Sequence, residues 1–469
     1  MSGTTSVGQA SPELLLELRP DTTLGRGVED ALRAAVRARR VTAGTRLPST
    51  RVLARDLGVS RRLVVEAYEQ LVAEGWLEAR QGSGTFVAQA APADAPGDAV
   101  DGGLPPEPER APYDFFPGEP DLSSFPREAW LRALRDVLRE APDAVLGYPD
   151  PAGRPELRAA LSAHLRRVRG AQAEPGRVIV VSGARQGLAL LGRALARAGH
   201  ERVAVERPSL PQHVDVLREA GRDVGGVQVD DEGLSVDDLA RSGADVIVAT
   251  PTHQMPLGVA LSPVRRAELL TWATALDDRL IVEDDYDAEY RYDRRPVGAL
   301  QGVAPAQVAY LGSASKTLAP GLRLGWLLLP ERLVAEVRRQ KELDDGGSEV
   351  LGQLALARLL QSAAYDRHLR RARRANRRRR DALVAALAEQ IPGARLDGLA
   401  AGLHAVVRLP VAVDAAALGT AAAARGVAAT PLPGAGGRTA ALILGYARLS
   451  EPAIAEGVRR LAAALGDAA

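Results

Sequence analysis

The chain has 469 residues, of which 46% are apolar, 25% are charged and none is cysteine, and its formal net charge is +1. The length predicts about two to four structural units, and the lack of cysteine excludes disulfides and thiol chemistry. The net charge alone does not indicate a nucleic-acid partner, so such a role would require a local basic surface.

Two further features concern the whole chain. The six histidines are scattered without the spacing of metal ligands, so we predict no metal site. No apolar run approaches the roughly 18–20 residues of a membrane span, and the N-terminus differs from a signal peptide. We therefore expect a cytoplasmic protein without a membrane partner.

The first predicted elements form a helix-turn-helix. Ser49 is placed to cap one helix that ends near Gly58, and Ser60 is placed to cap a second helix that ends before Gly75. Exposed arginines at the start of such a second helix can reach the major groove of DNA. The predicted core side of this helix holds Val64, Ala67 or Tyr68, and Leu71, and its solvent side holds Arg61, Arg62, Val65 and Glu69.

A two-stranded wing is predicted next, because Trp76-Leu77 and Thr85-Phe86-Val87 flank the turn sequence QGSG at 81–84. Five arginines and one aspartate between residues 46 and 62 provide the local basic surface that the net charge hides. The alternative is a packing module without DNA, since helix-turn-helix units also occur in that role.

The stretch RLPSTRVLARDLGVSRRLVVEAYEQL (46–71), followed by GWLEARQGSGTFV (75–87), resembles the GntR-type winged helix. We predict this domain over residues 12–89. The resemblance implies contact with double-stranded DNA through Arg51, Ser60, Arg61 and Arg62 and, at a wing tip near the minor groove, through Gly82 and Gly84.

Residues 90–112 are rich in Ala, Pro, Asp and Gly and are predicted to form an extended linker. Beyond them, short apolar runs alternate with helical patterns, which is typical of a mostly parallel sheet covered by helices on both faces. The ligand crevice of such a sheet lies beyond the carboxyl ends of its strands. The predicted strands are at 177–183, 202–208, 245–251, 279–285 and 308–313.

One of the few lysines, Lys316, follows the last of these strands in SASKTLAPGLRLGW (313–326). An isolated lysine is usually a solvated surface charge. A lysine beyond a strand end can instead form a Schiff base with an aldehyde, and Arg323, Ser313 and Ser315 are suited to bind a phosphate. A phosphorylated aldehyde indicates pyridoxal phosphate as the cofactor.

Other strand ends supply candidates for the rest of this cofactor. In RLIVEDDYDAEYRY (279–292), Asp284 is predicted to hold the pyridinium nitrogen and Tyr286 the phenolic oxygen. The alternatives are a solvated acidic loop or a metal site, although no second ligand cluster accompanies these carboxylates. The turn SGARQG (182–187) opens a helix whose free N–H groups can hold the phosphate, at Gly183, Ala184 and Arg185.

Together these stretches resemble the fold-type-I aminotransferases, and more specifically the MocR/GabR-type regulators, which join such a domain to a GntR-like winged helix. Other resembling stretches are FFPGEPDLSSFPREAW (115–130), GYPDPAGRPELRAAL (147–161) and ATPTHQMPLG (249–258). The resemblance implies an α/β fold in which a pyridoxal-phosphate-binding, aminotransferase-like domain spans 113–469 and ends in a small α+β subdomain.

The resemblance also implies that Lys316 carries the cofactor and that His253 lies near it. It implies a transcriptional regulator that senses a small amine, an amino acid or pyridoxal phosphate itself. The expected assembly is a homodimer in which head-to-tail packing places each winged helix on the partner's large domain.

Two positions depart from the family pattern. Leu210 stands where the family has an aromatic residue, commonly Tyr, so only an apolar contact with the cofactor ring remains. Ile443 aligns with an arginine that holds the α-carboxylate of a substrate, and Arg448 or Arg438 could substitute. If no arginine reaches that site, pyridoxal phosphate itself becomes the expected effector.

Three other functions stay open at this point. A working aminotransferase would use Lys316 and Asp284 but lacks an assured carboxylate arginine. A regulator that has lost the cofactor would fit Leu210, and a purely DNA-binding protein would leave Asp284, Lys316 and Arg323 unexplained. The run DRHLRRARRANRRRR (366–380) predicts a long exposed helix with acidic partners, and direct DNA contact by this run is the alternative.

Overall fold

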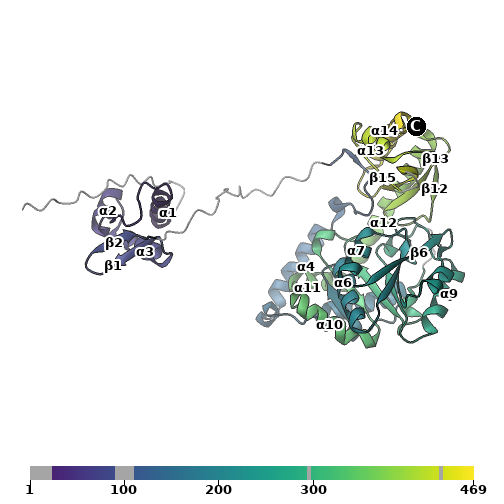
Figure 1. The fold of residues 1–469 in the computed structure, drawn as a ribbon, viewed down its shortest axis with the longest axis horizontal. Helices are drawn as coiled ribbons and strands as arrows, with labels where there is room; N and C mark the ends of the chain where they lie inside the picture. The colour runs from purple at the N-terminus through teal and green to yellow at the C-terminus, as the bar shows by residue number, and fades with distance from the viewer. Residues whose placement is uncertain (1–23, 90–109, 293–296, 433–436, 469) are drawn as a thin grey trace, which may run out of the picture. The chain divides into compact units, whose positions relative to one another are not determined.

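A computed structural model describes residues 24–292 and 297–468 of the chain, apart from 90–109 and 433–436. The chain divides into two compact units, Met1–Pro108 and Glu109–Ala469 (Figure 1). Most of the linker predicted at 90–112 lies outside the described residues.

The N-terminal unit is a winged helix, and its helix ends are where the sequence predicts them. The side chains of Ser49 and Ser60 accept hydrogen bonds from the first turns of α2 and α3, and Gly58 ends α2 in the left-handed conformation. The elements are α1 (Leu24–Arg37), α2 (Thr50–Leu57), α3 (Arg61–Ala73), β1 (Leu77–Arg80) and β2 (Gly84–Val87).

The core of this unit forms where α3 packs on α1, α2 and the wing. The predicted core residues Val64, Ala67, Tyr68 and Leu71 are all buried. Two details differ from expectation, because Val65 is half-buried and Trp76 precedes β1. Strands β1 and β2 are antiparallel, which confirms the wing.

The C-terminal unit is built on an eight-stranded sheet with the order β4-β11-β10-β9-β8-β5-β6-β7. Strands β10, β9, β8, β5 and β6 pair in parallel, whereas β11 is antiparallel to both β10 and β4, and β7 is antiparallel to β6. The five predicted strands correspond to β4, β5, β8, β9 and β10, and all five belong to this mostly parallel sheet. The bounds are β4 (Val178–Val181), β5 (Arg202–Arg207), β6 (Asp223–Asp230), β7 (Gly233–Leu234), β8 (Val246–Ala249), β9 (Leu280–Asp284), β10 (Val308–Ser313) and β11 (Gly325–Leu328).

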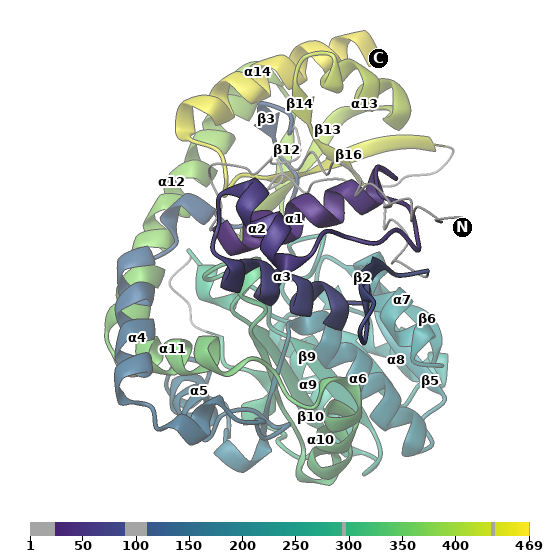
Figure 2. The same cartoon turned by 90° about the vertical axis from the view of Figure 1, so that its left-hand side faces the viewer.

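Helices cover both faces of the sheet (Figures 1 and 2). Successive strand side chains point to opposite faces, so Ala309 and Leu311 pack toward α6, α7 and α10, while Val308 packs toward α8 and α9. Tyr310 packs toward α5 and α11. The bounds are α4 (Arg127–Glu140), α5 (Pro155–Arg169), α6 (Ala184–Arg197), α7 (Pro211–Glu219), α8 (Val236–Ser242), α9 (Pro263–Thr274), α10 (Glu331–Asp345) and α11 (Val350–Gln361).

A smaller α+β subdomain completes this unit, as the resemblance implies. Its four-stranded antiparallel sheet has the order β12-β13-β16-β15. Phe115 belongs to its core, and β3 pairs with β14, so the start of the unit joins its end. The bounds are β3 (Tyr113–Asp114), α12 (Ala364–Gln390), β12 (Arg395–Asp397), β13 (His404–Asp414), α13 (Ala415–Ala423), β14 (Val427–Ala428), β15 (Thr430–Pro431), β16 (Arg438–Gly445) and α14 (Glu451–Ala468).

Among the described residues, none of the helices combines the length and the apolar character that crossing a membrane requires.

Candidate functional site

Three strand ends bring the predicted site residues of the C-terminal unit together. Strand β9 ends at Asp284, β10 ends at Ser313, and β4 ends two residues before Gly183. Strands β9 and β10 are neighbours, and β11 joins β10 to β4. One edge of the sheet therefore carries Asp284, the loop that holds Lys316, and the turn at Gly183.

Lys316 is partly buried and is not a solvated surface charge. Its Nζ donates a hydrogen bond to the Gly118 carbonyl at 2.5 Å, and its own carbonyl accepts one from the Tyr290 hydroxyl at 3.1 Å. Burial lowers the pKa of the Lys316 amine, whereas the nearby Asp287 and Asp284 oppose that shift. An amine with a lowered pKa is more often neutral and is therefore a better nucleophile.

Asp284 is a buried carboxyl group beside a neutral histidine. Its Oδ2 lies 3.6 Å from Nε2 of His213, which belongs to α7. Burial raises the pKa of Asp284 to about 7, Asp285 adds to the rise, and Lys316 opposes it. Burial lowers the pKa of His213 to about 4. Because a buried carboxylate is costly unless it is paired, this position is suited to hold a cationic ring nitrogen.

The opposite end of the site can hold an anion. The Ser315 amide donates to the Ser313 hydroxyl at 3.0 Å, and the two hydroxyls lie 2.7 Å apart. Gly183 precedes the first residue of α6, Ala184, and a Cβ atom at Gly183 would lie 3.3 Å from the Arg323 guanidinium. A guanidinium group and the free N–H groups of a helix start thus meet at one point, as phosphate binding requires.

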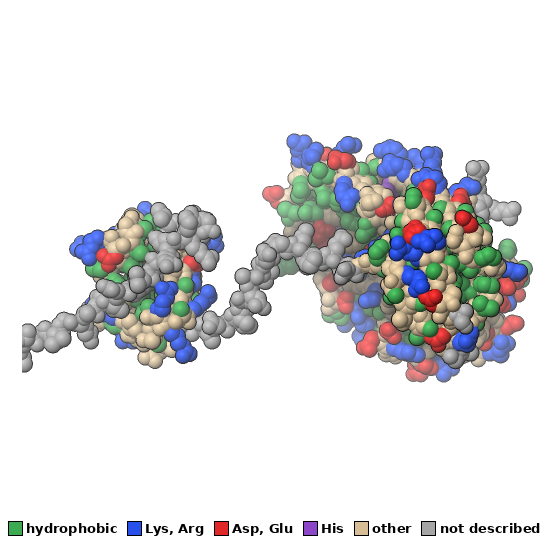
Figure 3. Space-filling view, turned by 90° about the horizontal axis from the view of Figure 1, so that it is seen from above, with side chains coloured by type: hydrophobic (Ala, Val, Ile, Leu, Met, Phe, Trp, Pro, Cys, Tyr) green, Lys and Arg blue, Asp and Glu red, His purple; other side chains and the backbone are tan. Residues whose placement is uncertain are grey.

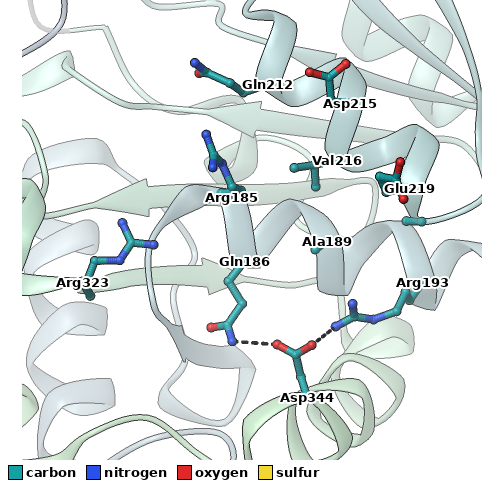
Figure 4. A pocket seen from close by; sticks show the side chains of 11 residues that line it. Arg185, Gln186, Ala189, Arg193, Gln212, Asp215, Val216, Glu219, Arg323 and Asp344 are labelled. Atoms are coloured by element: carbon teal, nitrogen blue, oxygen red, sulfur yellow. Dashed lines mark hydrogen bonds and ion pairs between the residues drawn. The ribbon is translucent and has the colours of Figure 1, made fainter. Parts of the chain in front are cut away.

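A cleft of about 590 Å³ opens beside this anion site, between α6, α7 and α10. Arg323 and Arg185 both line it and are exposed. Figure 4 shows Arg323 at one end of the cleft and Glu219 at the other, with Asp344 held by Gln186 and Arg193. The cleft connects the predicted phosphate ligands to solvent.

His253 and Tyr286 lie together beneath the small subdomain. The Tyr286 hydroxyl is 3.0 Å from Nδ1 of His253, and the same nitrogen is 2.8 Å from Oδ2 of Asp287. Gly402 has a left-handed φ of 71°, and a Cβ there would overlap the His253 ring. The close approach of the small subdomain therefore fixes His253, which in turn orients Tyr286.

Neither position that departs from the family pattern supplies an arginine, and the two arginines that could substitute contact other groups. Ile443 is a buried residue of β16 that pairs with β13 and β15. The Arg448 guanidinium lies 2.8 Å from Asp114 and 3.0 Å from Glu119. Arg438 is exposed and donates to a backbone carbonyl of β13, and Leu210 is half-buried at the start of α7.

Several contacts of this site were not predicted. Gly118 and Glu119 belong to a stretch that showed the family resemblance, but their position beside Lys316 depends on a contact between segments 198 residues apart in the sequence. His213 follows the predicted strand 202–208 by five residues, and the helical pattern there gave no sign that it faces Asp284.

The donor set of the C-terminal unit fits pyridoxal phosphate. It combines an amine with a lowered pKa, a buried carboxyl group suited to a cationic nitrogen, and an anion site where a glycine leaves room at the start of α6. These are the groups that this cofactor's aldehyde, ring and phosphate need.

The winged helix places its predicted residues on an exposed surface. Arg51, Ser60, Arg61 and Arg62 are all exposed at the starts of α2 and α3, and Arg62 pairs with Glu66 at 2.7 Å. Gly82 and Gly84 are exposed at the wing tip with positive φ. Arg46, which was not singled out, lies against this tip, because a Cβ at Gly84 would be 3.1 Å from its Nε.

Comparison with known proteins assigns each unit to a protein family. Residues 117–461 match the family model for aminotransferase class I and II, and residues 24–87 match that for bacterial regulatory proteins of the gntR family. The chain is 34% identical to the probable rhizopine catabolism regulatory protein MocR of Rhizobium meliloti, over 96% of this chain and 95% of that protein.

Two further comparisons concern a second regulator and a solved aminotransferase structure. The chain is 33% identical to the HTH-type pyridoxine biosynthesis transcriptional regulator PdxR of Corynebacterium glutamicum, over 84% of this chain and 86% of that protein. The solved structure of the α-aminoadipate aminotransferase LysN from Thermus thermophilus, complexed with N-(5'-phosphopyridoxyl)-L-leucine, is 28% identical. Its TM-score is 0.67, over 75% of this chain and 92% of that chain.

Proposed function

Since the chain belongs to the MocR-type family of transcriptional regulators, which join a gntR-type DNA-binding domain to an aminotransferase class I and II domain, we propose that its C-terminal unit senses a small molecule. The chain is a pyridoxal-phosphate-dependent, DNA-binding transcriptional regulator. Sensing requires that the C-terminal unit have two arrangements whose effects on DNA affinity differ. A regulator of this kind acts in the cytoplasm, where DNA is available.

The proposed domain boundaries are 12–89 for the winged helix, 90–112 for the linker and 113–469 for the effector-binding domain. Exposure of the basic helix starts and of the wing tip supports their role in DNA contact. The residues proposed to contact DNA are Arg51, Ser60, Arg61, Arg62, Gly82 and Gly84.

When bound, pyridoxal phosphate supplies an aldehyde that reacts with amines and a ring that withdraws electrons. We assign Lys316 to carry it through its amine and Asp284 to hold the ring nitrogen. Tyr286, held by His253, is placed to donate to the phenolic oxygen. The residues proposed to bind the phosphate are Arg323, Ser313, Ser315, Gly183, Ala184 and Arg185.

The effector proposed here is pyridoxal phosphate itself, or an amine that lacks an α-carboxylate. The observation that carries this proposal is the pairing of Arg448 with Asp114 and Glu119, together with the buried Ile443. An amino-acid carboxylate would have to displace two acidic partners from Arg448. The same observation disfavours steady turnover of an amino acid and a 2-oxo acid.

A homodimer is the proposed assembly. Leu131 and Leu138 lie seven residues apart on α4 and are 51% and 62% exposed, and Tyr148 nearby in the sequence is fully exposed. Large apolar side chains that recur at this spacing on one helix face are typical of a surface that a partner covers.

The effect of the cofactor on DNA affinity tests this function. A DNA fragment is first selected from genomic DNA by the wild-type protein, and its Kd is then measured with and without pyridoxal phosphate. We expect a shift of about fivefold or more in the wild type, which corresponds to a typical coupling free energy, and no shift in Lys316→Ala. Equal affinities in all four measurements would contradict the proposal, and a shift that appears only after an amino acid is added would contradict the proposed effector.

A further inference from the structure

Helix α12 carries a set of arginines that the cofactor site does not use. Residues 366–380 of this helix include nine arginines and one aspartate. Figure 2 shows α12 along an outer edge of the C-terminal unit, and Figure 3 shows Lys and Arg side chains gathered at the upper edge of that unit. These observations raise the question of which partner the arginines bind.

Five of the arginines lie along one side of the helix and are all exposed. Their spacings of three, four, seven and ten residues keep them on one face, opposite the buried Tyr365, Leu369 and Asn376. We call this set the arginine stripe, and its members are Arg367, Arg370, Arg371, Arg374 and Arg377.

The acidic partners predicted for this run are present for other arginines but not for the stripe. Arg378 pairs with Glu451 and Arg379 with Asp121. Asp366, the one acidic residue of the run, pairs with Arg167 of α5. Among the residues that the structure describes, no ion pair involves the stripe, so the acidic partners that are present serve other arginines of the run. Like charges at such spacings repel one another.

The chemistry of the stripe favours a polyanion over a protein surface. Every exposed residue between 367 and 377 is an arginine, so this surface lacks the apolar and aromatic centre of a typical protein interface. Ten residues of helix span about 15 Å. A DNA duplex carries one phosphate charge per roughly 1.7 Å of its axis, so a segment of that length presents several phosphates to the stripe.

From these observations we infer that the arginine stripe of α12 is a second DNA-binding surface, which contacts the phosphate backbone without reading bases. The inference rests on the proposed function, because the winged helix must hold the duplex near the same chain. A duplex held in this way meets the stripe at a raised effective concentration, so contacts that are weak alone add to the affinity.

Salt-dependent DNA binding by the full-length protein tests this inference. The probe is a random-sequence duplex of about 60 base pairs, which is much longer than the stripe, and its Kd is measured by fluorescence anisotropy over a series of NaCl concentrations. The stripe variant carries Arg370→Gln, Arg371→Gln and Arg374→Gln. The matched control carries Arg218→Gln, Arg339→Gln and Arg395→Gln, which remove the same charge from exposed positions scattered over the C-terminal unit.

The stripe variant is expected to bind about tenfold or more weakly at moderate salt, and its plot of log affinity against log salt is expected to be less steep by about 2–3, since each phosphate contact contributes roughly 0.9 to the slope. The control is expected to keep the wild-type slope. Equal slopes in the stripe variant and the control would overturn the inference. Tighter binding by the stripe variant would also overturn it.

A separate variant distinguishes this outcome from failure of the proposed function. Arg61→Gln with Arg62→Gln removes two charges from the winged helix only. If this variant weakens binding while the stripe variant does not, the winged helix binds DNA and the second surface is wrong. If only the stripe variant weakens binding, the assignment of DNA contact to α3 is wrong. Circular dichroism and Tm values check that all variants are folded.

Discussion

At the scale of single residues, Lys316 and Asp284 form the chemical centre of the C-terminal unit. Burial disfavours the charged form of each side chain, so the pKa of the lysine falls and that of the aspartate rises. The site therefore keeps the amine reactive and leaves the carboxyl group in need of a cationic partner. These two requirements suit the aldehyde and the ring nitrogen of one cofactor.

Asp284→Asn is expected to change the pH dependence of stability in the cofactor-free protein. The pKa of Asp284 is about 7 when folded, and an unperturbed aspartate has one of about 3.9. Between these values the folded state holds a proton that the unfolded chain releases, so the free energy of unfolding falls as pH rises from about 4 to 7. In the wild type, Asp284 is expected to lower the free energy of unfolding by about 2–3 kcal/mol between pH 5 and pH 8, and the variant should lack this decrease. Urea unfolding at a series of pH values measures it.

Glu206→Gln is the matched control for Asp284→Asn. Glu206 is also buried with a pKa raised to about 7, but its carboxyl group is held by Thr250 and Gln254. Both variants should make the free energy of unfolding less dependent on pH. Asp284→Asn alone should weaken the binding of pyridoxal phosphate, by about tenfold or more, because it removes a charged hydrogen-bond partner. Equal losses of cofactor affinity would show that the role given to Asp284 is wrong.

At the scale of elements, Ser60 joins two roles at the start of α3. Its hydroxyl accepts a hydrogen bond from the Leu63 amide, and it precedes the exposed Arg61 and Arg62. The cap stabilises the helix, and the position faces the proposed DNA surface. Substitutions at this residue can therefore separate stability from DNA binding.

Ser60→Asp is expected to preserve the cap, since aspartate caps helices as well as serine does, but to repel phosphates. DNA affinity should fall about tenfold at moderate salt with little change in the free energy of unfolding. Ser60→Ala removes the cap without adding a charge. It should lower the free energy of unfolding by about 1 kcal/mol and leave DNA affinity nearly unchanged. Ser235→Asp makes the same exchange at the cap of α8 in the other unit, and it should change neither the DNA affinity nor the free energy of unfolding. Unchanged DNA affinity in Ser60→Asp would remove Ser60 from the DNA surface.

How far the elements could be predicted depends on whether their signals are local. The caps at Ser49 and Ser60, the glycine stop at Gly58 and the strands β4, β5, β8, β9 and β10 depend on nearby residues, and all were predicted. The place of β11 between β4 and β10 was not predicted, because an apolar run indicates burial but gives neither strand direction nor neighbours. The contact of His213 with Asp284 was not predicted for the same reason, since it joins α7 to β9.

At the scale of the whole molecule, the proposed homodimer has a direct test. Leu131→Glu with Leu138→Glu places two charges on the exposed apolar face of α4. We expect this variant to sediment as a monomer at concentrations where the wild type is a dimer, because a buried unpaired charge is costly. Val264→Glu on α9, at a position that is also 62% exposed, should leave the assembly unchanged. If the double variant is still dimeric, the interface lies on another surface.

Regulation by this molecule depends on the link between cofactor binding and DNA binding. The winged helix has its own core, and the C-terminal unit brings together the groups that we propose bind the cofactor. The glycines at 398 and 402 bring the small subdomain against the loop that holds His253. A ligand that moves this loop would therefore move the small subdomain as well.

Reductive labelling of the protein with pyridoxal phosphate tests the central claim most directly. The chain has two lysines, and the second, Lys341, is fully buried and bound to Asp345 and Ser348. The near-visible absorption spectrum is recorded with added cofactor, borohydride is added, and the modified peptide is identified by mass spectrometry. We predict a near-visible band and a label on Lys316 in the wild type, and neither in Lys316→Ala. No band at saturating cofactor, or a label confined to Lys341 or the N-terminus, would contradict the account.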